Sequence, residues 1–309
     1  MRVINILILL SISAFLLNCS ENNTGLSPTG LSPNIINCKI YEGNCRYPVW
    51  SASGDYIVFE GNGEGTPGLY IIDTEGNKLR LLLKDEGFGE LKPLDFSNDD
   101  YLIFNSWVDD FTRIYYLQPN GKNPVFIANG NGTAIYGNIN DYYNIVYLPW
   151  IDLYVHYIGI YVTDTHHSKP KLLNETIVPY PDISPDGKRL AYFRGEENSV
   201  NIYVYDIETK EEKFICEVSN FGCTCLRWSP DGKWLAFNGG YTLDRKNFSK
   251  RVVWIVSSEG GEPTPLFDDP NYPYWCSPGV LSFSWSPDGK WIVYDMGTEG
   301  ELWKVRVFE

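Results

Sequence analysis

The chain has 309 residues, of which 43% are hydrophobic and 15% aromatic. This composition supplies enough apolar material for a folded core and excludes an intrinsically disordered protein. The formal net charge of −14 makes the surface strongly acidic. Because an acidic surface repels a phosphate backbone, nucleic acid is not an expected partner.

The N-terminal segment, residues 1–18, is typical of a secretory signal. Arg2 supplies a positive charge, and residues 3–17 form an apolar run that is too short to span a bilayer comfortably. The run ends in Leu-Leu-Asn-Cys, which resembles a bacterial lipobox and implies a lipoprotein with its lipid on Cys19. The alternative is an ordinary signal peptide followed by an incidental cysteine.

A polar segment follows the signal. Residues 19–34 are rich in Gly, Pro and Ser, so we expect a flexible tether between the membrane and the folded domain of residues 35–309.

Six cysteines remain once Cys19 is set aside, and an even number outside the cytoplasm suggests disulfides. Cys38 and Cys45 are close in sequence, and we expect them to pair and brace the N-terminal arm. The other four lie in the last third of the chain, and we predict two pairs: Cys216–Cys223 and Cys225–Cys276. Metal binding by Cys-x-Cys is the alternative, but no histidine lies nearby.

An internal repeat dominates the sequence. Each copy has an apolar anchor residue, a turn related to Ser-Pro-Asp-Gly and an alternating apolar run. Successive copies lie roughly 45 residues apart, which is about the length of one propeller blade. Three copies are nearly identical: 183–192, 228–237 and 285–294. Three worn copies precede them: 50–59, 96–104 and 139–147.

The turn residues predict a β-hairpin in each copy. Proline presets its φ angle, aspartate binds nearby amides, and glycine adopts a positive φ. A third strand such as residues 202–205 follows, then a polar turn and a short fourth strand. Four antiparallel strands repeated six times predict an all-β fold, a six-bladed β-propeller of four-stranded blades.

The repeat consensus Trp-Ser-Pro-Asp-Gly-Lys-Trp resembles the repeat of TolB-type, WD40-like propellers, which also occurs in relatives of prolyl oligopeptidase. The resemblance covers residues 35–309 and concerns the fold more than the function, because this repeat serves many roles. TolB-type propellers contact a lipoprotein partner, so the resemblance implies a protein-binding role.

The last copy ends after its third strand, and its blade therefore lacks a fourth. An open edge would leave backbone groups unpaired. The apolar residues 35–41 precede the first copy, and we predict that they form the missing strand and close the ring.

Catalytic motifs are absent from the sequence. It contains neither Gly-x-Ser-x-Gly nor His-Glu-x-x-His, and its histidines are few: His156, His166 and His167. We therefore expect no metal site and no cofactor.

One set of polar positions lies where a strand next to the propeller axis is predicted. These residues directly precede the anchor of each repeat: Val49, Asp95, Asn138, Asp182, Arg227 and Ser284. We predict that they line a central channel, where two acids, an Asn and an Arg could hold a cation or a peptide terminus. Structural hydrogen bonds between blades are the alternative.

A dense group of aromatic residues interrupts the third repeat. It includes Tyr142, Tyr143, Tyr147, Trp150, Tyr154 and Tyr157. Such a patch could form a surface for a peptide or a glycan. The alternative is the core of an irregular blade.

The sequence thus predicts a non-catalytic, monomeric propeller in the bacterial cell envelope, anchored by its lipid in the outer membrane and facing the periplasm or the cell surface. Its expected partner is an envelope protein or peptide. A carbohydrate-active lyase or hydrolase with its site in the central channel is the alternative function. A structural or sensory subunit of an envelope complex is a third.

Overall fold

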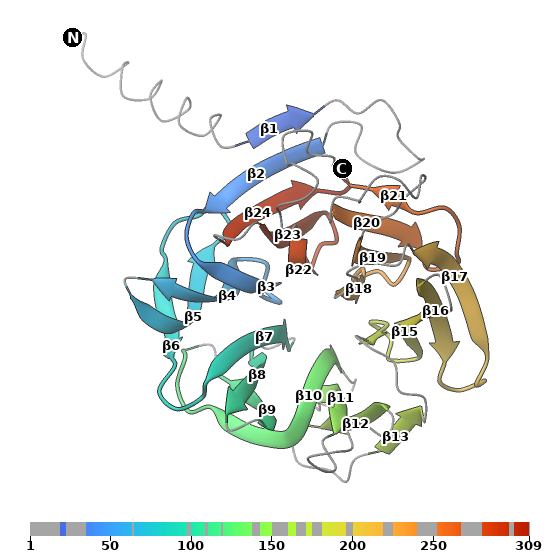
Figure 1. Cartoon of the computed structure of the whole chain (residues 1–309), viewed down its shortest axis with the longest axis horizontal. Helices are drawn as coiled ribbons and strands as arrows, with labels where there is room; N and C mark the ends of the chain where they lie inside the picture. The colour runs from blue at the N-terminus through green and yellow to red at the C-terminus, as the bar shows by residue number, and fades with distance from the viewer. Residues whose placement is uncertain are drawn as a thin grey trace.

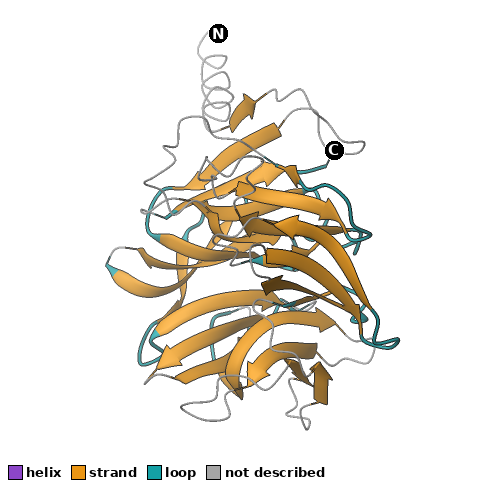
Figure 2. Ribbon diagram, turned by 45° about the vertical axis from the view of Figure 1, so that its right-hand side comes forward, coloured by secondary structure: helices purple, strands orange, loops and turns teal. Residues whose placement is uncertain are grey.

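The computed structural model describes residues 19–22, 35–63, 65–97, 100–108, 111–118, 120–137, 143–149, 160–164, 171–174, 181–195, 200–218, 225–239, 252–266, 280–296 and 300–308. The described elements are strands joined by loops (Figure 2). No helix among them is long and apolar enough to cross a membrane. The strands form five antiparallel sheets arranged as sectors around one axis (Figure 1).

Three of the sheets have four strands, and each begins with the strand nearest the axis. The first contains β3 (Cys45–Trp50), β4 (Tyr56–Gly63), β5 (Thr66–Asp73) and β6 (Arg80–Lys84). Another contains β14 (Asp182–Ile183), β15 (Arg189–Gly195), β16 (Val200–Asp206) and β17 (Glu212–Val218). The third contains β18 (Leu226–Trp228), β19 (Trp234–Gly239), β20 (Val252–Ser257) and β21 (Thr264–Pro265).

A fourth sheet has seven strands and contains the second and third sequence repeats. Its strands are β7 (Glu90–Phe96), β8 (Leu102–Val108), β9 (Phe111–Leu117), β10 (Val125–Gly137), β11 (Tyr143–Pro149), β12 (Ile160–Asp164) and β13 (Lys171–Asn174). The long strand β10 pairs with β9 through residues 125–129 and with β11 through residues 130–137. The predicted propeller of four-stranded antiparallel blades is confirmed, but the predicted number of six blades is wrong, because the described strands form five sheets. The link between the second and third repeats is itself an extended, paired strand, β10, and it joins these two repeats in one sheet.

The fifth sheet closes the ring. It contains β22 (Val280–Trp285), β23 (Trp291–Met296), β24 (Glu301–Arg306), β2 (Ile35–Tyr41) and β1 (Cys19–Asn22). Strand β2 pairs antiparallel with β24, which confirms the prediction for residues 35–41. The tether predicted for residues 19–34 is wrong over β1, which pairs with β2. Pairing satisfies the amide and carbonyl groups that an open edge of β2 would leave without partners.

The Ser-Pro-Asp-Gly turn is held by its own side chains. In the copy that starts at Ser229, the Gly232 amide donates to the Ser229 carbonyl at 2.9 Å, and the hydroxyl of Ser229 donates to Asp231 at 2.6 Å. The same hydroxyl accepts the Trp234 amide at 3.0 Å. Gly232 has a φ of 69°, which an L-residue adopts only with strain. Equivalent serine and aspartate bonds occur at Ser184 and Ser286.

The same turns also touch each other around the ring. A Cβ atom placed on Gly232 would lie 3.8 Å from Pro185 of the preceding repeat, and one on Gly289 would lie 3.7 Å from Pro230. Each proline ring therefore lies beside the turn glycine of the next repeat. The turn sequence thus contributes to packing between sheets as well as to the hairpin.

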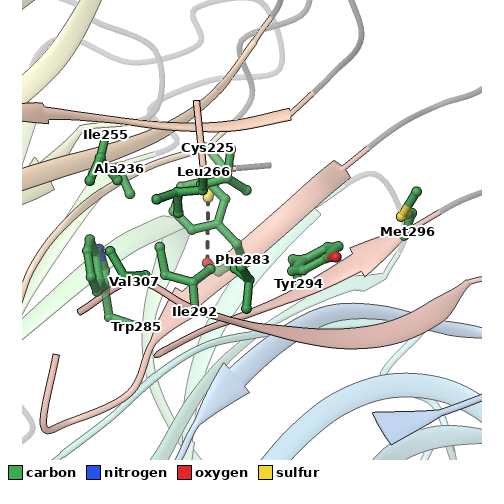
Figure 3. Close-up of a cluster of buried hydrophobic side chains, with 12 residues drawn as sticks. Cys225, Ala236, Ile255, Leu266, Phe283, Trp285, Ile292, Tyr294, Met296 and Val307 are labelled. Carbon is green, nitrogen blue, oxygen red and sulfur yellow. Dashed lines mark hydrogen bonds between the residues drawn. The ribbon is translucent and has the colours of Figure 1, made fainter. Parts of the chain in front are cut away.

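Hydrophobic cores lie between neighbouring sheets. Figure 3 shows the core between the sheet of β18–β21 and the closing sheet, in which Ala236 and Ile255 face Trp285 and Ile292. The repeat places similar residues at equivalent positions in every sheet, so each interface buries an apolar face from both sides. Burial between sheets is the main source of stability in this arrangement.

The three predicted disulfides are wrong. Cys45, Cys216 and Cys225 are buried thiols outside any disulfide, whereas Cys38 is disulfide-bonded. Cys45 begins the innermost strand of the first sheet, where its thiol donates to the Gly300 carbonyl. Cys225 belongs to the core of Figure 3, with its sulfur 3.8 Å from the Phe283 carbonyl. Closeness in sequence does not bring such thiols together. Cys223 and Cys276 lie outside the described residues.

Lys304 links the closing sheet to the first sheet. Its ammonium group donates to the Thr74 carbonyl at 2.7 Å and to Glu75 at 3.1 Å, and it lies 5.2 Å from the ring centre of Trp291. Only 12% of the side chain is exposed. A charged hydrogen bond in such a place contributes about 1.5–3 kcal/mol.

We predict that Lys304→Met lowers the melting temperature by about 2–5 °C, because the two hydrogen bonds between the sheets are lost. Thermal unfolding followed by circular dichroism measures this. The matched control is Lys78→Met, which makes the same chemical change on a side chain that is 78% exposed. Equal shifts in the two variants would refute the linking role of Lys304.

Candidate functional site

A cavity of about 360 Å³ opens at the end of the axis where the Ser-Pro-Asp-Gly turns gather. The innermost strands β3, β7, β14, β18 and β22 and the turns that follow them form its wall. Pro185, Pro230 and Pro287 lie at the rim and are exposed. The anchor residues Trp50 and Trp228 also line the cavity. The last three repeats thus each place a proline at the rim, whereas the first two contribute Ala52 and Ser97 to the wall.

The polar residues of the cavity are those that precede the anchors. Asp95, Asp182, Arg227 and Ser284 all line it, so the fold brings together four of the predicted channel residues. Asn138 lies outside the described residues. Val49 is buried in β3 and is not part of the wall. Whether this wall binds a ligand stays a prediction.

Most of the predicted aromatic patch lies outside the described residues, and only Tyr143 and Tyr147 belong to a described strand, β11. Tyr142, Trp150 and Tyr154 lie outside the described residues, and Tyr143 is described only as the first residue of β11. The patch therefore remains a prediction from sequence.

Two of the channel residues also join neighbouring sheets. The Asp182 carboxylate on β14 accepts the Trp228 amide of β18 at 2.7 Å. The hydroxyl of Ser284 on β22 accepts the Trp50 amide of β3 at 3.2 Å. Asp182 and Ser284 therefore form hydrogen bonds between sheets, which was the alternative to a channel role, and they also line the cavity.

Asp95 has fewer bonds than Asp182. From the described residues its carboxylate accepts one hydrogen bond, from the amide of the adjacent Phe96 at 2.8 Å. Burial raises the pKa of Asp95 to about 7, against the opposing effects of this hydrogen bond and of Arg227. Burial likewise raises the pKa of Asp182 to about 6. Both carboxyls thus change charge near neutral pH.

Arg227 is the cation of the cavity wall. Its guanidinium group donates to the carbonyl of the adjacent Leu226 at 3.0 Å. No described carboxylate lies within ion-pair distance of it, although its charge lowers the pKa values of Asp95 and Asp182. Four of its five N–H donors therefore remain for water or a ligand.

Lys92 was not among the channel residues predicted from the sequence. Its ammonium group lies 4.9 Å from the ring centre of Tyr47, and burial followed by the charge of Arg227 lowers its pKa. Simple strand alternation would place Lys92 and Asp95 on opposite faces of β7. However, the pairing with β8 slips between Pro93 and Asp95. This bulge restores a common face and brings both residues close to Arg227. No local sequence signal indicates a bulge here.

The described wall of the cavity has a simple chemical composition. In the described part of the chain, no three His, Cys, Asp or Glu side chains converge as a metal site would require. The wall instead combines an apolar rim with a few polar groups, which is the usual composition of a ligand-binding site.

Known proteins are similar in sequence to parts of this chain. The family model for the WD domain, G-beta repeat, matches residues 212–244. The uncharacterized peptidase YuxL of Bacillus subtilis (strain 168) is 35% identical over 128 residues, which cover 39% of this chain and 18% of the relative. The putative Tricorn-like protease C-terminal subunit of Sulfurisphaera tokodaii is 24% identical over 277 residues, covering 80% of this chain and 29% of the relative. The chain thus spans less than a third of either curated relative.

Solved structures with a similar fold cover nearly all of the chain. Putative TolB from Agrobacterium tumefaciens has a TM-score of 0.59 at 19% identity and covers 92% of this chain and 100% of its own. A gluconolactonase from Xanthomonas campestris has a TM-score of 0.63 at 11% identity and covers 94% of this chain and 98% of its own. An oligogalacturonate lyase from Vibrio parahaemolyticus has a TM-score of 0.56 at 11% identity and covers 94% of this chain and 97% of its own.

Fold and repeat together define the class of this protein: it is a β-propeller, whose residues 212–244 match the WD-domain repeat and whose fold is similar to that of TolB structures. At these identities the structural likenesses concern the fold alone, and the neighbours include both TolB proteins and enzymes.

The raised pKa of Asp95 predicts a pH dependence of stability. A carboxyl whose pKa is higher in the folded chain than in the unfolded chain takes up a proton on folding between the two values, here about 4 and about 7. The free energy of unfolding therefore falls as the pH rises through this window and is level above it. Asp95→Asn cannot ionise and lacks this contribution.

We expect the free energy of unfolding of the wild type to fall by about 2 kcal/mol more than that of Asp95→Asn between about pH 5 and about pH 7. Urea unfolding at each pH measures the difference. Asp55→Asn, which changes an exposed turn carboxylate, is the control and should follow the wild type. Parallel curves for wild type and Asp95→Asn would show that Asp95 has no raised pKa.

Proposed function

We propose that this protein is a binding module whose cavity, at the turn end of the propeller axis, receives a segment of a protein or peptide partner. One observation carries the proposal: the innermost strands and turns converge on a single wall that has an apolar rim and unpaired polar groups inside it. The rigid ring holds this wall in place without a ligand, so little ordering is needed on binding.

The likeness to TolB structures supports a protein-binding role in a bacterial envelope. The N-terminal sequence supports the same location, with residues 1–18 as the signal and a lipid on Cys19 as the anchor. The acidic surface disfavours direct adhesion to anionic lipid, so the acyl chains would supply the membrane affinity.

A photo-reactive phenylalanine analogue at Pro230 tests the proposal, because this residue is exposed at the rim. We predict one discrete crosslinked species when the full-length protein carries the analogue in envelope membranes. The matched control is the same analogue at Glu208, an exposed residue in the turn between β16 and β17. The same adduct from both positions, or adducts from Glu208 alone, would contradict binding at the cavity.

A second candidate function is a lyase or hydrolase that acts on carbohydrate. The observation that favours it is Asp95, a carboxyl with a pKa of about 7 near the unpaired Arg227, which suits general acid–base chemistry. Some propellers of similar fold are enzymes, including the oligogalacturonate lyase.

For this candidate we predict release of unsaturated products from polygalacturonate, followed by ultraviolet absorbance. Asp95→Asn should reduce the rate at least about a hundredfold, because it removes the proton-transfer group, whereas Asp55→Asn should not. No turnover by the wild type, or an unchanged rate in Asp95→Asn, would remove this candidate.

A further inference from the structure

Two cations lie in or near the cavity: Arg227 lines it, whereas Lys92 is not among the lining residues but lies within reach of the Arg227 charge. These cations and the nearby acids are unevenly partnered. Arg227 bonds only to its neighbour's carbonyl, and Lys92 contacts the ring of Tyr47 with no hydrogen-bond acceptor among the described residues. The nearby acids, by contrast, are occupied by backbone amides. The Asp182 carboxylate accepts a hydrogen bond from the Trp228 amide. The two carboxylate oxygens of Asp295 accept hydrogen bonds from the amides of Tyr47 and Ser282, at 3.0 Å and 2.8 Å.

Two cations without carboxylate partners are costly to bury and attract an anion. The guanidinium group is the better defined of the two, because its planar N–H donors match the two oxygens of a carboxylate. Lys92 lies close enough for the charge of Arg227 to act on it. The two positive charges can therefore act on the same anion.

We propose that the cavity recognises a carboxylate of the partner peptide, either its C-terminal group or an acidic side chain, through Arg227 with Lys92 as the supporting charge. The inference rests on the proposed function and specifies its ligand.

A peptide fits the wall better than an acidic sugar does. Sugars stack on open aromatic faces, but Trp50, Trp228 and Trp285 are only 6%, 5% and 7% exposed. The exposed part of the rim consists of prolines, beside which an extended peptide can lie. An acidic oligosaccharide is therefore the competing outcome of the test.

The binding strength should depend on pH. The groups that act on the two cations come from four strands: Glu90, Lys92 and Asp95 on β7, Asp182 on β14, Cys225 just before β18 and Arg227 on it, and Asp295 on β23. Of these, Asp95 and Asp182 gain protons as the pH falls below about 7 and about 6. Acid thus removes negative charge from the site while a peptide carboxylate stays ionised.

The test uses the full-length protein in detergent and calorimetric titration with acetyl-tetraalanine, as the free acid and as the C-terminal amide. Acetyl-glutamate amide and acetyl-glutamine amide distinguish a side-chain carboxylate from a terminal one, and trigalacturonate tests the sugar. We expect one acid to bind at least about tenfold more tightly than its amide. Arg227→Gln should abolish this preference, and Lys92→Gln should reduce it a few-fold.

Asp95→Asn separates recognition from a structural role. At about pH 8 this variant should bind the acid peptide nearly as tightly as the wild type does at about pH 5.5. The reason is that the substitution removes the negative charge of Asp95, which protonation removes from the wild type at the lower pH. Arg80→Gln changes an exposed arginine on β6 and should have no effect.

Equal binding of acids and amides, or tighter binding of trigalacturonate, would overturn the proposal that the cavity recognises a peptide carboxylate. Crosslinking at Pro230 could still succeed in that case, and the proposed function would stand. Failure of that crosslink together with all four peptides would overturn the proposed function itself.

Discussion

Hydrogen bonds between β2 and β24 hold the ring closed, because they join the start of the folded domain to its end. Without β2, the third strand of the last sheet would present a row of unpaired amide and carbonyl groups. The same closure positions Lys304 against the first sheet and lets Ser284 bond to Trp50. The cavity wall is complete only when the last sheet lies beside the first.

Within this closed ring, the repeated turn does three things. Its serine and aspartate hold the hairpin, its glycine supplies the positive φ, and its proline lies beside the next turn. The turns also form the rim of the cavity. A sequence feature needed for folding thus also provides the prolines at the mouth of the cavity.

The positions before the anchors differ in their hydrogen bonds. Asp182 and Ser284 bond across sheet boundaries, so their presence in the wall follows from the architecture. Among the described residues, Arg227 has no such structural partner. Burying an unpaired guanidinium group costs free energy, and a ligand that pairs with it offsets that cost. This difference within one ring of equivalent positions separates Arg227, the group proposed to recognise a ligand, from those that hold the sheets together.

The sequence by itself determined the hairpins, the propeller class, the closing strand and four residues of the wall, because these follow from local turn chemistry and a regular repeat. Tertiary structure alone decided the continuity of β10, the separate places of Cys38 and Cys45, and the position of Lys92. Each depends on which strands meet and in what register. A single bulge in β7 moves a lysine to the face of Asp95, and no local pattern of residues indicates it.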